Sequence, residues 1–106
     1  MIQLPGDDGF DPVFTVGQVS SFLKVQPAFL RRLDTEQVIQ PARSDGGQRR
    51  YSRHDITQVQ RVVDLVNEGL TLAGIVRVFA LEAQVKELQR QLSQERALRR
   101  VDESAS

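Results

Sequence analysis

The stretch Gly46-Gly47-Gln48-Arg49-Arg50-Tyr51-Ser52 joins a glycine turn to two arginines, a tyrosine and a serine that can cap a helix. Glycine supplies the positive-φ backbone that a tight hairpin needs. An arginine guanidinium is planar and permanently charged, and it matches the oxygens of a phosphate group. A solvated loop with incidental arginines is the alternative interpretation of these residues. The pattern favours a hairpin that contacts nucleic acid.

Two short helices are predicted before this hairpin. Thr15 and Gln18 fit a capping box, and the apolar residues that follow at helical spacing predict a helix over residues 16–22. Proline is tolerated at the first position of a helix but not in its interior, so Pro27 predicts a second helix over residues 27–35. Its apolar face holds Phe29, Leu30 and Leu33. Two short helices joined by a tight turn are typical of a helix-turn-helix, whose second helix enters the DNA major groove.

The hairpin itself is predicted as a wing of two antiparallel strands, over residues 38–41 and 48–51. Ser52 and Asp55 then resemble a second capping box, which begins a third helix. The apolar residues of this helix recur at steps of three and four: Ile56, Val59, Val63, Val66 and Leu70. Gly69 is expected to end it.

A fourth helix is predicted after Thr71, which can act as its N-cap. Further along, apolar residues with a 4-3-4 spacing continue between charged flanks, which is typical of a coiled coil. The residues expected to mediate dimerisation are Phe79, Leu81, Val85, Leu88 and Leu92. A lone helix cannot cover such a stripe, so self-association is favoured over the alternative that residues 81–98 fold back onto the chain's own core.

The predicted fold is therefore mainly α. A winged helix-turn-helix DNA-binding domain with two short wing strands spans residues 13–80, and a coiled-coil dimerisation helix spans residues 81–100. Residues 1–12 are rich in Gly, Pro and Asp, a composition that predicts a disordered tail. A second disordered tail is expected over residues 101–106.

The 106 residues have zero net charge, but residues 16–61 carry a net charge of +4, the distribution expected of a nucleic-acid-binding element. The chain has no cysteine, so disulfides and thiolate metal sites are excluded, and we expect neither a metal nor another cofactor. No apolar run approaches a membrane span, and the predicted location is the cytoplasm, on the nucleoid. His54 is the single histidine and has no nucleophile placed beside it, so we do not expect an enzyme.

The second helix and the wing supply the expected DNA contacts. A guanidinium of Arg31 or Arg32 can bond a guanine edge, and Phe29 or Ala28 can touch a thymine methyl, although Phe29 also suits the core. The residues predicted to bind double-stranded DNA are Thr15, Gln26, Ala28, Phe29, Arg31, Arg32, Arg43, Gln48, Arg49, Arg50 and Tyr51.

The connected series of motifs resembles the mercury-resistance-regulator (MerR) family of bacterial transcription factors. The residues that carry this resemblance are Phe14-Thr15-Val16-Gly17-Gln18-Val19, Pro27, Leu30-Arg31-Arg32, Asp34, Ile39-Gln40-Pro41-Ala42-Arg43, Gly46-Gly47-Gln48-Arg49-Arg50-Tyr51-Ser52, Asp55-Ile56 and Glu68-Gly69-Leu70-Thr71-Leu72-Ala73-Gly74-Ile75. The last of these, with the short end of the chain, looks most like the heat-shock-repressor (HspR-like) branch. The chain departs from the family pattern at Phe29, Leu33 and Gln37.

The resemblance implies a homodimer, joined by an antiparallel coiled coil, that binds an inverted-repeat promoter site and distorts it. It implies backbone or base contacts for Arg50, Arg31 and Arg32. Sensors of this family hold ligands with cysteines or an added domain, and neither is expected here, so the prediction is a repressor without a small-molecule effector. RNA polymerase and a chaperone co-regulator are the further partners that the resemblance suggests. The alternatives are an excisionase-like DNA-bending factor and a coiled-coil adaptor that binds other proteins.

Overall fold

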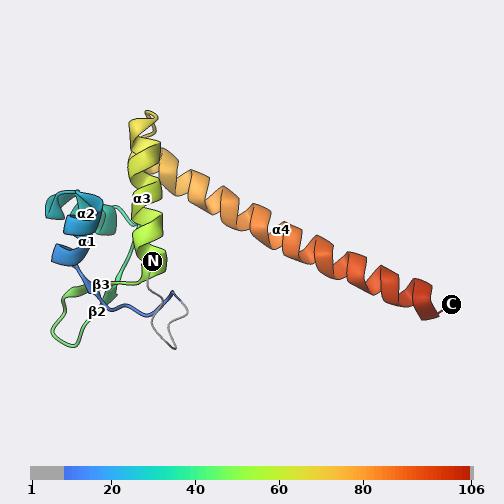
Figure 1. The fold of residues 1–106 in the computed structure, drawn as a ribbon. Helices are drawn as coiled ribbons and strands as arrows, with labels where there is room; N and C mark the ends of the chain where they lie inside the picture. Colours follow the sequence, from blue (N-terminus) through green and yellow to red (C-terminus); the bar gives the residue numbers. More distant parts are fainter. Residues whose placement is uncertain (1–8, 106) are drawn as a thin grey trace. The chain divides into compact units, whose positions relative to one another are not determined.

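The computed structural model describes residues 9–105 of the chain (Figure 1). The elements in chain order are β1 (Phe14–Thr15), α1 (Val16–Leu23), α2 (Pro27–Thr35), β2 (Ala42–Arg43), β3 (Arg49–Tyr51), α3 (Arg53–Asn67) and α4 (Leu72–Ala105). The chain divides into two compact units between Ile75 and Val76. We call them the N-terminal unit, which ends at Ile75, and the C-terminal unit, which begins at Val76 and consists of the rest of α4.

Local sequence signals set where the helices begin. The Thr15 hydroxyl accepts a hydrogen bond from the backbone N–H of Gln18 at 3.1 Å, and the Gln18 side chain accepts one from the N–H of Thr15 at 2.9 Å. Helix α2 begins at Pro27. The hydroxyl of Thr71 accepts from the N–H of Gly74 at 3.0 Å and thereby caps the start of α4. These three helix starts confirm the predictions made from capping residues and proline.

The second capping box, at the start of α3, is also confirmed. The Ser52 hydroxyl accepts from the N–H of Asp55 at 3.0 Å, and the Asp55 carboxylate accepts from the N–H of Ser52 at 3.0 Å. At its other end α3 stops at Asn67, and Gly69 follows with φ of +98°. Only glycine adopts such a backbone readily, which explains why the helix ends there.

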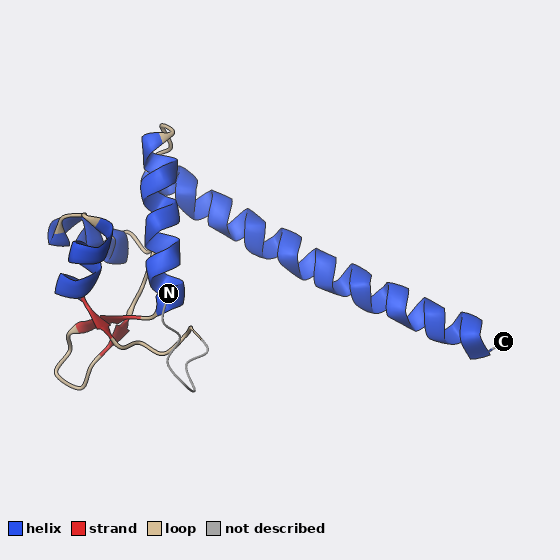
Figure 2. Cartoon of the chain, in the orientation of Figure 1, coloured by secondary structure: helices blue, strands red, loops and turns tan. Residues whose placement is uncertain are grey.

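The three short strands form one antiparallel sheet in the order β1-β3-β2 (Figure 2). The predicted strand over residues 38–41 is wrong, because the wing strand is β2, at Ala42–Arg43. The N–H groups of Val38 and Ile39 donate to the carbonyl oxygen of Leu33, at 2.8 and 3.2 Å. These bonds close the end of α2, so the two residues are not free to pair in a sheet. Strand β1 was not predicted, since two residues carry no periodicity.

In the described part of the chain, the core lies in the N-terminal unit. Its buried apolar residues come from α1, α2, the loop after α2, β3, α3 and the start of α4: Val19, Leu30, Leu33, Ile39, Tyr51, Val59, Val62, Leu72 and Ile75. Helix α3 turns Val59 and Val62 inward, whereas Val66 is 38% exposed, so its buried face is rotated from the one that the spacing suggested. Phe29 is half-buried.

The predicted tails differ from the structure where it describes them. Residues 1–8 and Ser106 lie outside the described residues, but the carbonyl oxygen of Gly9 accepts a hydrogen bond from the N–H of His54 at 2.8 Å. The ring of Phe10 packs against His54 with centroids 4.9 Å apart. At the other end α4 continues to Ala105. Disorder is therefore wrong for Gly9 and Phe10, which are held against α3, and for residues 101–105, which are helical. No helix in the described part of the chain is both long and apolar enough to span a membrane.

Candidate nucleic-acid interface

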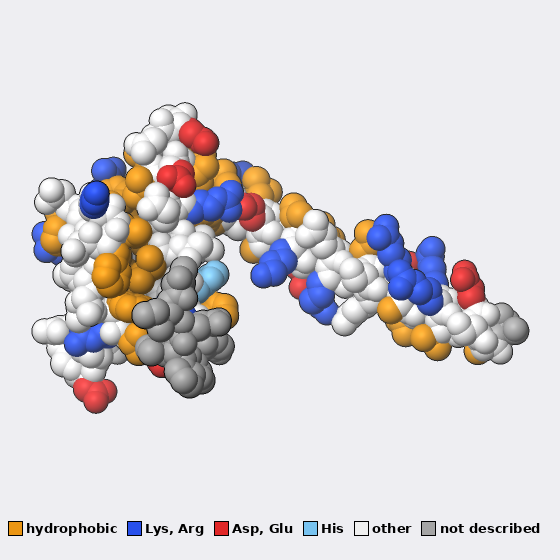
Figure 3. All heavy atoms as spheres, in the orientation of Figure 1, with side chains coloured by type: hydrophobic (Ala, Val, Ile, Leu, Met, Phe, Trp, Pro, Cys, Tyr) orange, Lys and Arg blue, Asp and Glu red, His pale blue; other side chains and the backbone are white. Residues whose placement is uncertain are grey.

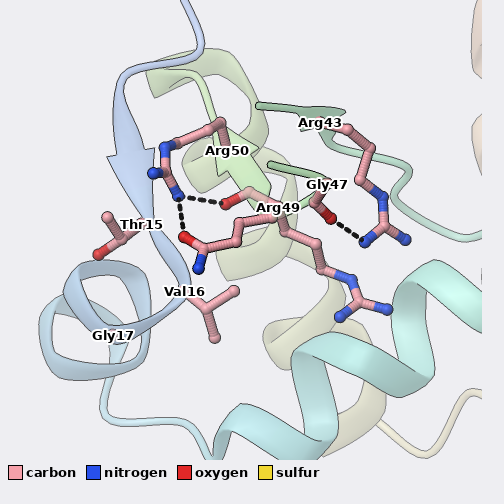
Figure 4. Close-up of a pocket in the computed structure, with 8 residues that line it drawn as sticks. Thr15, Val16, Gly17, Arg43, Gly47, Arg49 and Arg50 are labelled. Carbon is pink, nitrogen blue, oxygen red and sulfur yellow. Dashed lines mark hydrogen bonds between the residues drawn. The ribbon is translucent and has the colours of Figure 1, made fainter. Parts of the chain in front are cut away.

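Pairing of β1 with β3 places Arg50 opposite Thr15, at the start of α1. The result is an open hollow of about 420 Å³ between the wing and the first turn of α1 (Figure 4). Three arginines and two glycines are among the residues that line it: Thr15, Val16, Gly17, Arg43, Gly47, Gln48, Arg49 and Arg50. Four of the residues predicted to contact DNA in the wing therefore line one surface with Thr15.

The first turn of α1 gives this hollow donors as well as charge. The first four N–H groups of an α-helix have no partner within the helix, and the capping box satisfies those of Thr15 and Gln18 but not those of Val16 and Gly17. Those of Val16 and Gly17 lie at the hollow, at the positive end of the helix dipole. Analysis of the sequence missed Val16 and Gly17 as binding residues, although the predicted cap at Thr15 already marked this helix start. Such a helix start suits a phosphate group.

Arg50 is the wing arginine whose charge stays available. Its Nη1 donates to the Gln48 side-chain oxygen at 3.4 Å and to the carbonyl oxygen of Arg49 at 3.2 Å. Neither acceptor is charged, and among the described residues no carboxylate binds its guanidinium. In Figure 4 the side chain lies alongside β1, near Thr15 and Val16.

The other two wing arginines bind one carboxylate. Asp34 Oδ2, in the last turn of α2, accepts from Arg43 Nη2 at 2.8 Å and from Arg49 Nε at 2.7 Å. The Arg49 side chain is only 20% exposed, whereas that of Arg43 is 50% exposed and also donates to the carbonyl oxygen of Gly47 at 3.2 Å. Phosphate contact by Arg49 stays a prediction, and in the structure its half-buried guanidinium is bound to Asp34.

Helix α2 presents its predicted cations to solvent. Arg31 is exposed, and its side chain has no hydrogen bond or ion pair with any described residue. Arg32 Nε lies 2.6 Å from Glu36 Oε2, but both side chains are exposed, and such pairs contribute little. A DNA phosphate or base can therefore replace Glu36 as the partner of Arg32. Gln26 and Ala28 are also exposed at the start of α2.

Tyr51 is a core residue rather than a surface one. Its side chain is 1% exposed, so the predicted DNA contact of Tyr51 is wrong in this structure. Side chains alternate between the two faces of a strand, so burial of Tyr51 in β3 places its neighbour Arg50, which is half-buried, on the opposite face. Burial raises the pKa of the Tyr51 phenol above its ordinary value.

A sequence model described as "MerR HTH family regulatory protein" matches residues 14–82, from β1 into α4. The chain belongs to the MerR family. It is 39% identical over 79 residues to a Streptomyces coelicolor protein that carries the name heat shock protein HspR, a match that spans 74% of this chain and 52% of that protein. It is 27% identical over 71 residues to the transcriptional regulator GlnR of Bacillus anthracis, spanning 67% and 55%. The chain thus spans about half the length of these curated relatives.

Solved MerR structures share the fold. A MerR-family transcriptional regulator from Bacillus cereus matches with a TM-score of 0.59 at 21% identity, covering 84% of this chain and 75% of that one. HiNmlR, described as a MerR-family regulator that lacks the sensor domain and is bound to promoter DNA, matches with a TM-score of 0.58 at 21% identity, covering 84% of both chains. Among the described residues no cluster of three or more His, Cys, Asp or Glu side chains could hold a metal ion.

The segment matched by the MerR model ends within α4, at residue 82, and the predicted dimerisation residues lie on both sides of that point, all in the C-terminal unit. Leu81, Val85, Leu88 and Leu92 are 55%, 52%, 63% and 45% exposed. Phe79 is half-buried and belongs to a different face of the helix. Charged side chains lie beside apolar ones along this unit (Figure 3). We call the four exposed residues the α4 seam.

Proposed function

We propose that this MerR-family chain is a sequence-specific DNA-binding transcriptional regulator that acts as a homodimer on an inverted repeat. The observation that carries the proposal is the hollow at which Arg50 meets the open first turn of α1, and the exposed Arg31 on α2 adds a second cation without a described partner. The likeness to HiNmlR, which was crystallised with promoter DNA, supports it.

In the proposed complex, α2 lies in the major groove and the wing follows the sugar-phosphate backbone. Arg31 and Arg32 are the candidates for bonds to base edges. The hollow receives a phosphate group, which the N–H groups of Val16 and Gly17 and the guanidinium of Arg50 bind together. Phosphate contacts position the protein, and base contacts select the sequence.

The test is a titration of purified protein with a random duplex and with a duplex that the wild type selects from a random pool. We expect Arg50→Ala to weaken binding to both duplexes and to lower the slope of log K against log salt by about 0.9, the value for one phosphate contact. Arg31→Ala should weaken binding to the selected duplex more and relax its preference at one base position. Wild-type affinity in both variants would contradict the proposal.

The homodimer is proposed to form along the α4 seam. Each Leu or Val buried there contributes about 1.5–3 kcal/mol relative to exposure. In a parallel alignment the next seam positions would place Glu95 against Glu95 and Arg99 against Arg99 of the second copy, and like charges at the seam oppose association. An antiparallel alignment avoids both contacts. Because the 4-3-4 spacing reads the same in both directions, Leu81 then lies opposite the partner's Leu92, and Val85 opposite the partner's Leu88.

Two such protomers are related by a two-fold axis, and a two-fold symmetric protein matches an inverted repeat. Repression, and recruitment of RNA polymerase or a chaperone, stay predictions from the family resemblance. An in vitro transcription assay on promoter DNA that carries the selected site distinguishes repression from activation.

A further inference from the structure

Three charged side chains connect α2 to the wing: Asp34, Arg43 and Arg49, which we call the Asp34 clamp. Both arginines donate to the same oxygen, Asp34 Oδ2. The clamp joins residues that are 9 and 15 positions apart in the chain, and it links the last turn of α2 to both strands of the wing hairpin.

The Asp34 carboxylate offsets a repulsion between two arginines in the sheet. Arg43 on β2 and Arg49 on β3 are directly opposite one another in the register, and like charges at opposed positions of a strand pair are destabilising. A single carboxylate that accepts from both guanidinium groups removes most of that repulsion. The Asp34 side chain is 14% exposed, so solvent screens this interaction less than it screens a surface pair.

An aspartate at position 34 does not stabilise helix α2 itself. A negative charge in the last turn of a helix lies at the negative end of the helix dipole and is unfavourable there. The two charge-assisted hydrogen bonds of the Asp34 clamp offset this unfavourable interaction of the Asp34 charge with the helix dipole. Asp34 therefore serves the contact between α2 and the wing rather than α2 alone.

We propose that Asp34 is a positioning residue for DNA recognition, which holds the wing in a fixed register with α2 and withdraws Arg49 from phosphate contact. This inference rests on the proposed function. A duplex presents its major groove and its backbone at a fixed spacing, so α2 and the wing must engage together for the bases to be read. With the clamp intact, Arg49 acts inside the protein, and Arg50 carries the phosphate contact.

Removal of the carboxylate has two opposite consequences. It frees two guanidinium groups, which raises the attraction to any duplex, and it loosens the wing from α2, which lowers discrimination among sequences. A residue with a merely structural role would lower the affinity for all duplexes and would not add phosphate contacts. The salt slope therefore separates the two roles.

The test compares Asp34→Asn with Asp45→Asn by fluorescence anisotropy, over a KCl series, with the random and the wild-type-selected duplex. Asp45 lies in the exposed wing turn outside the clamp, so its variant makes the same change in net charge. We expect Asp34→Asn to steepen the salt slope on random duplex by about 1–2 units, and to lower the ratio of selected to random affinity roughly tenfold. Asp45→Asn should keep that ratio, and Asp34→Glu, which keeps a carboxylate, should restore much of it.

Identical slopes and ratios for Asp34→Asn and Asp45→Asn would overturn the inference. If Asp34→Asn does not fold, the salt slopes of Arg49→Ala and Arg50→Ala test the inference instead. The inference requires that only Arg50→Ala lowers the salt slope, by about 0.9. An equal loss of slope in Arg49→Ala would make Arg49 a phosphate contact and defeat the clamp. A wild type that binds neither duplex would instead contradict the proposed DNA binding, and the role of the clamp with it.

Discussion

The hydroxyl of Tyr51 is buried in the core of the N-terminal unit, and no described residue makes a hydrogen bond with it. A buried polar group without a partner costs about 1–3 kcal/mol. The ring itself fills the space between the sheet and the helices and is among the largest fully buried side chains. Tyr51 thus combines favourable packing of its ring with an unfavourable position of its oxygen.

We expect Tyr51→Phe to keep the packing and to raise the free energy of unfolding by about 1 kcal/mol, because it removes only the unpaired hydroxyl. Urea denaturation of the two proteins measures the difference. A loss of about 1 kcal/mol or more would show that the hydroxyl has a stabilising partner. DNA affinity should stay unchanged, which distinguishes a core residue from a phosphate contact.

The same residue predicts the behaviour of the protein in alkali. Burial, the main cause, raises the pKa of the Tyr51 phenol in the folded state. Below pH of about 10, the ordinary tyrosine pKa, the phenol is neutral in both states and stability is unaffected. Above it the unfolded chain ionises first, so stability falls as pH rises toward the folded-state pKa.

Tyr51 is the single tyrosine and the chain has no tryptophan, so tyrosinate absorbance reports on this residue alone. The titration midpoint should lie at higher pH in the native protein than in the protein unfolded by urea. Equal midpoints would mean that the phenol is solvated. The Tyr51→Phe variant should lack this component of the loss of stability in alkali.

At the scale of the element, the start of α3 connects the wing to the core. Ser52 is 4% exposed, directly follows β3, and forms the two reciprocal hydrogen bonds of a capping box with Asp55. Because this cap is buried, water cannot replace the serine hydroxyl as a partner for the N–H of Asp55. Arg50 in β3 lies two residues before this cap.

We expect Ser52→Ala to lower the free energy of unfolding by about 1–2 kcal/mol, the usual cost of losing an N-cap. Thr57→Ala is the control, since Thr57 is exposed on the same helix and donates to the carbonyl oxygen of Arg53 at 3.2 Å. Its loss should change stability by less than about 0.5 kcal/mol. If urea titrations gave the same change in the free energy of unfolding for both substitutions, the Ser52 cap would not stabilise the protein more than an exposed hydroxyl does.

At the scale of the whole molecule, the α4 seam predicts how two copies meet. The chain has no native cysteine, so introduced thiols report on the interface without a background. We expect the double variant Leu81→Cys/Leu92→Cys to form disulfide-linked dimers on oxidation. An antiparallel alignment brings the thiol at position 81 of one copy opposite the thiol at position 92 of the other. Each single variant should remain uncrosslinked, and a mixture of the two single variants should link only as the mixed pair.

A parallel dimer would give the reverse pattern, with each single variant linked to its own copy. Glu87→Cys is the control, because position 87 lies off the seam between Val85 and Leu88. Non-reducing gel electrophoresis gives the readout. Absence of any linked species, together with a monomer in sedimentation, would exclude the proposed dimer.

Helix starts and the α4 seam could be predicted from the sequence because their causes are local. The capping boxes at Thr15 and Ser52 join residues three positions apart, and Pro27 restricts its own backbone. The spacing of apolar residues along α4 needs only the helical period. Family membership could be inferred for the same reason, since it rests on short motifs in a fixed order.

The tertiary structure decided which arginines are available. The β1–β3 pairing that brings Arg50 to the first turn of α1, the Asp34 clamp that holds Arg49, and the burial of Tyr51 all depend on contacts between distant parts of the chain. Arg49 and Arg50 are neighbours of one chemical type, so no local pattern distinguishes them. Their partners do, because the guanidinium of Arg49 is bound to a partly buried carboxylate, whereas that of Arg50 has only neutral acceptors and is the one that we propose binds the duplex.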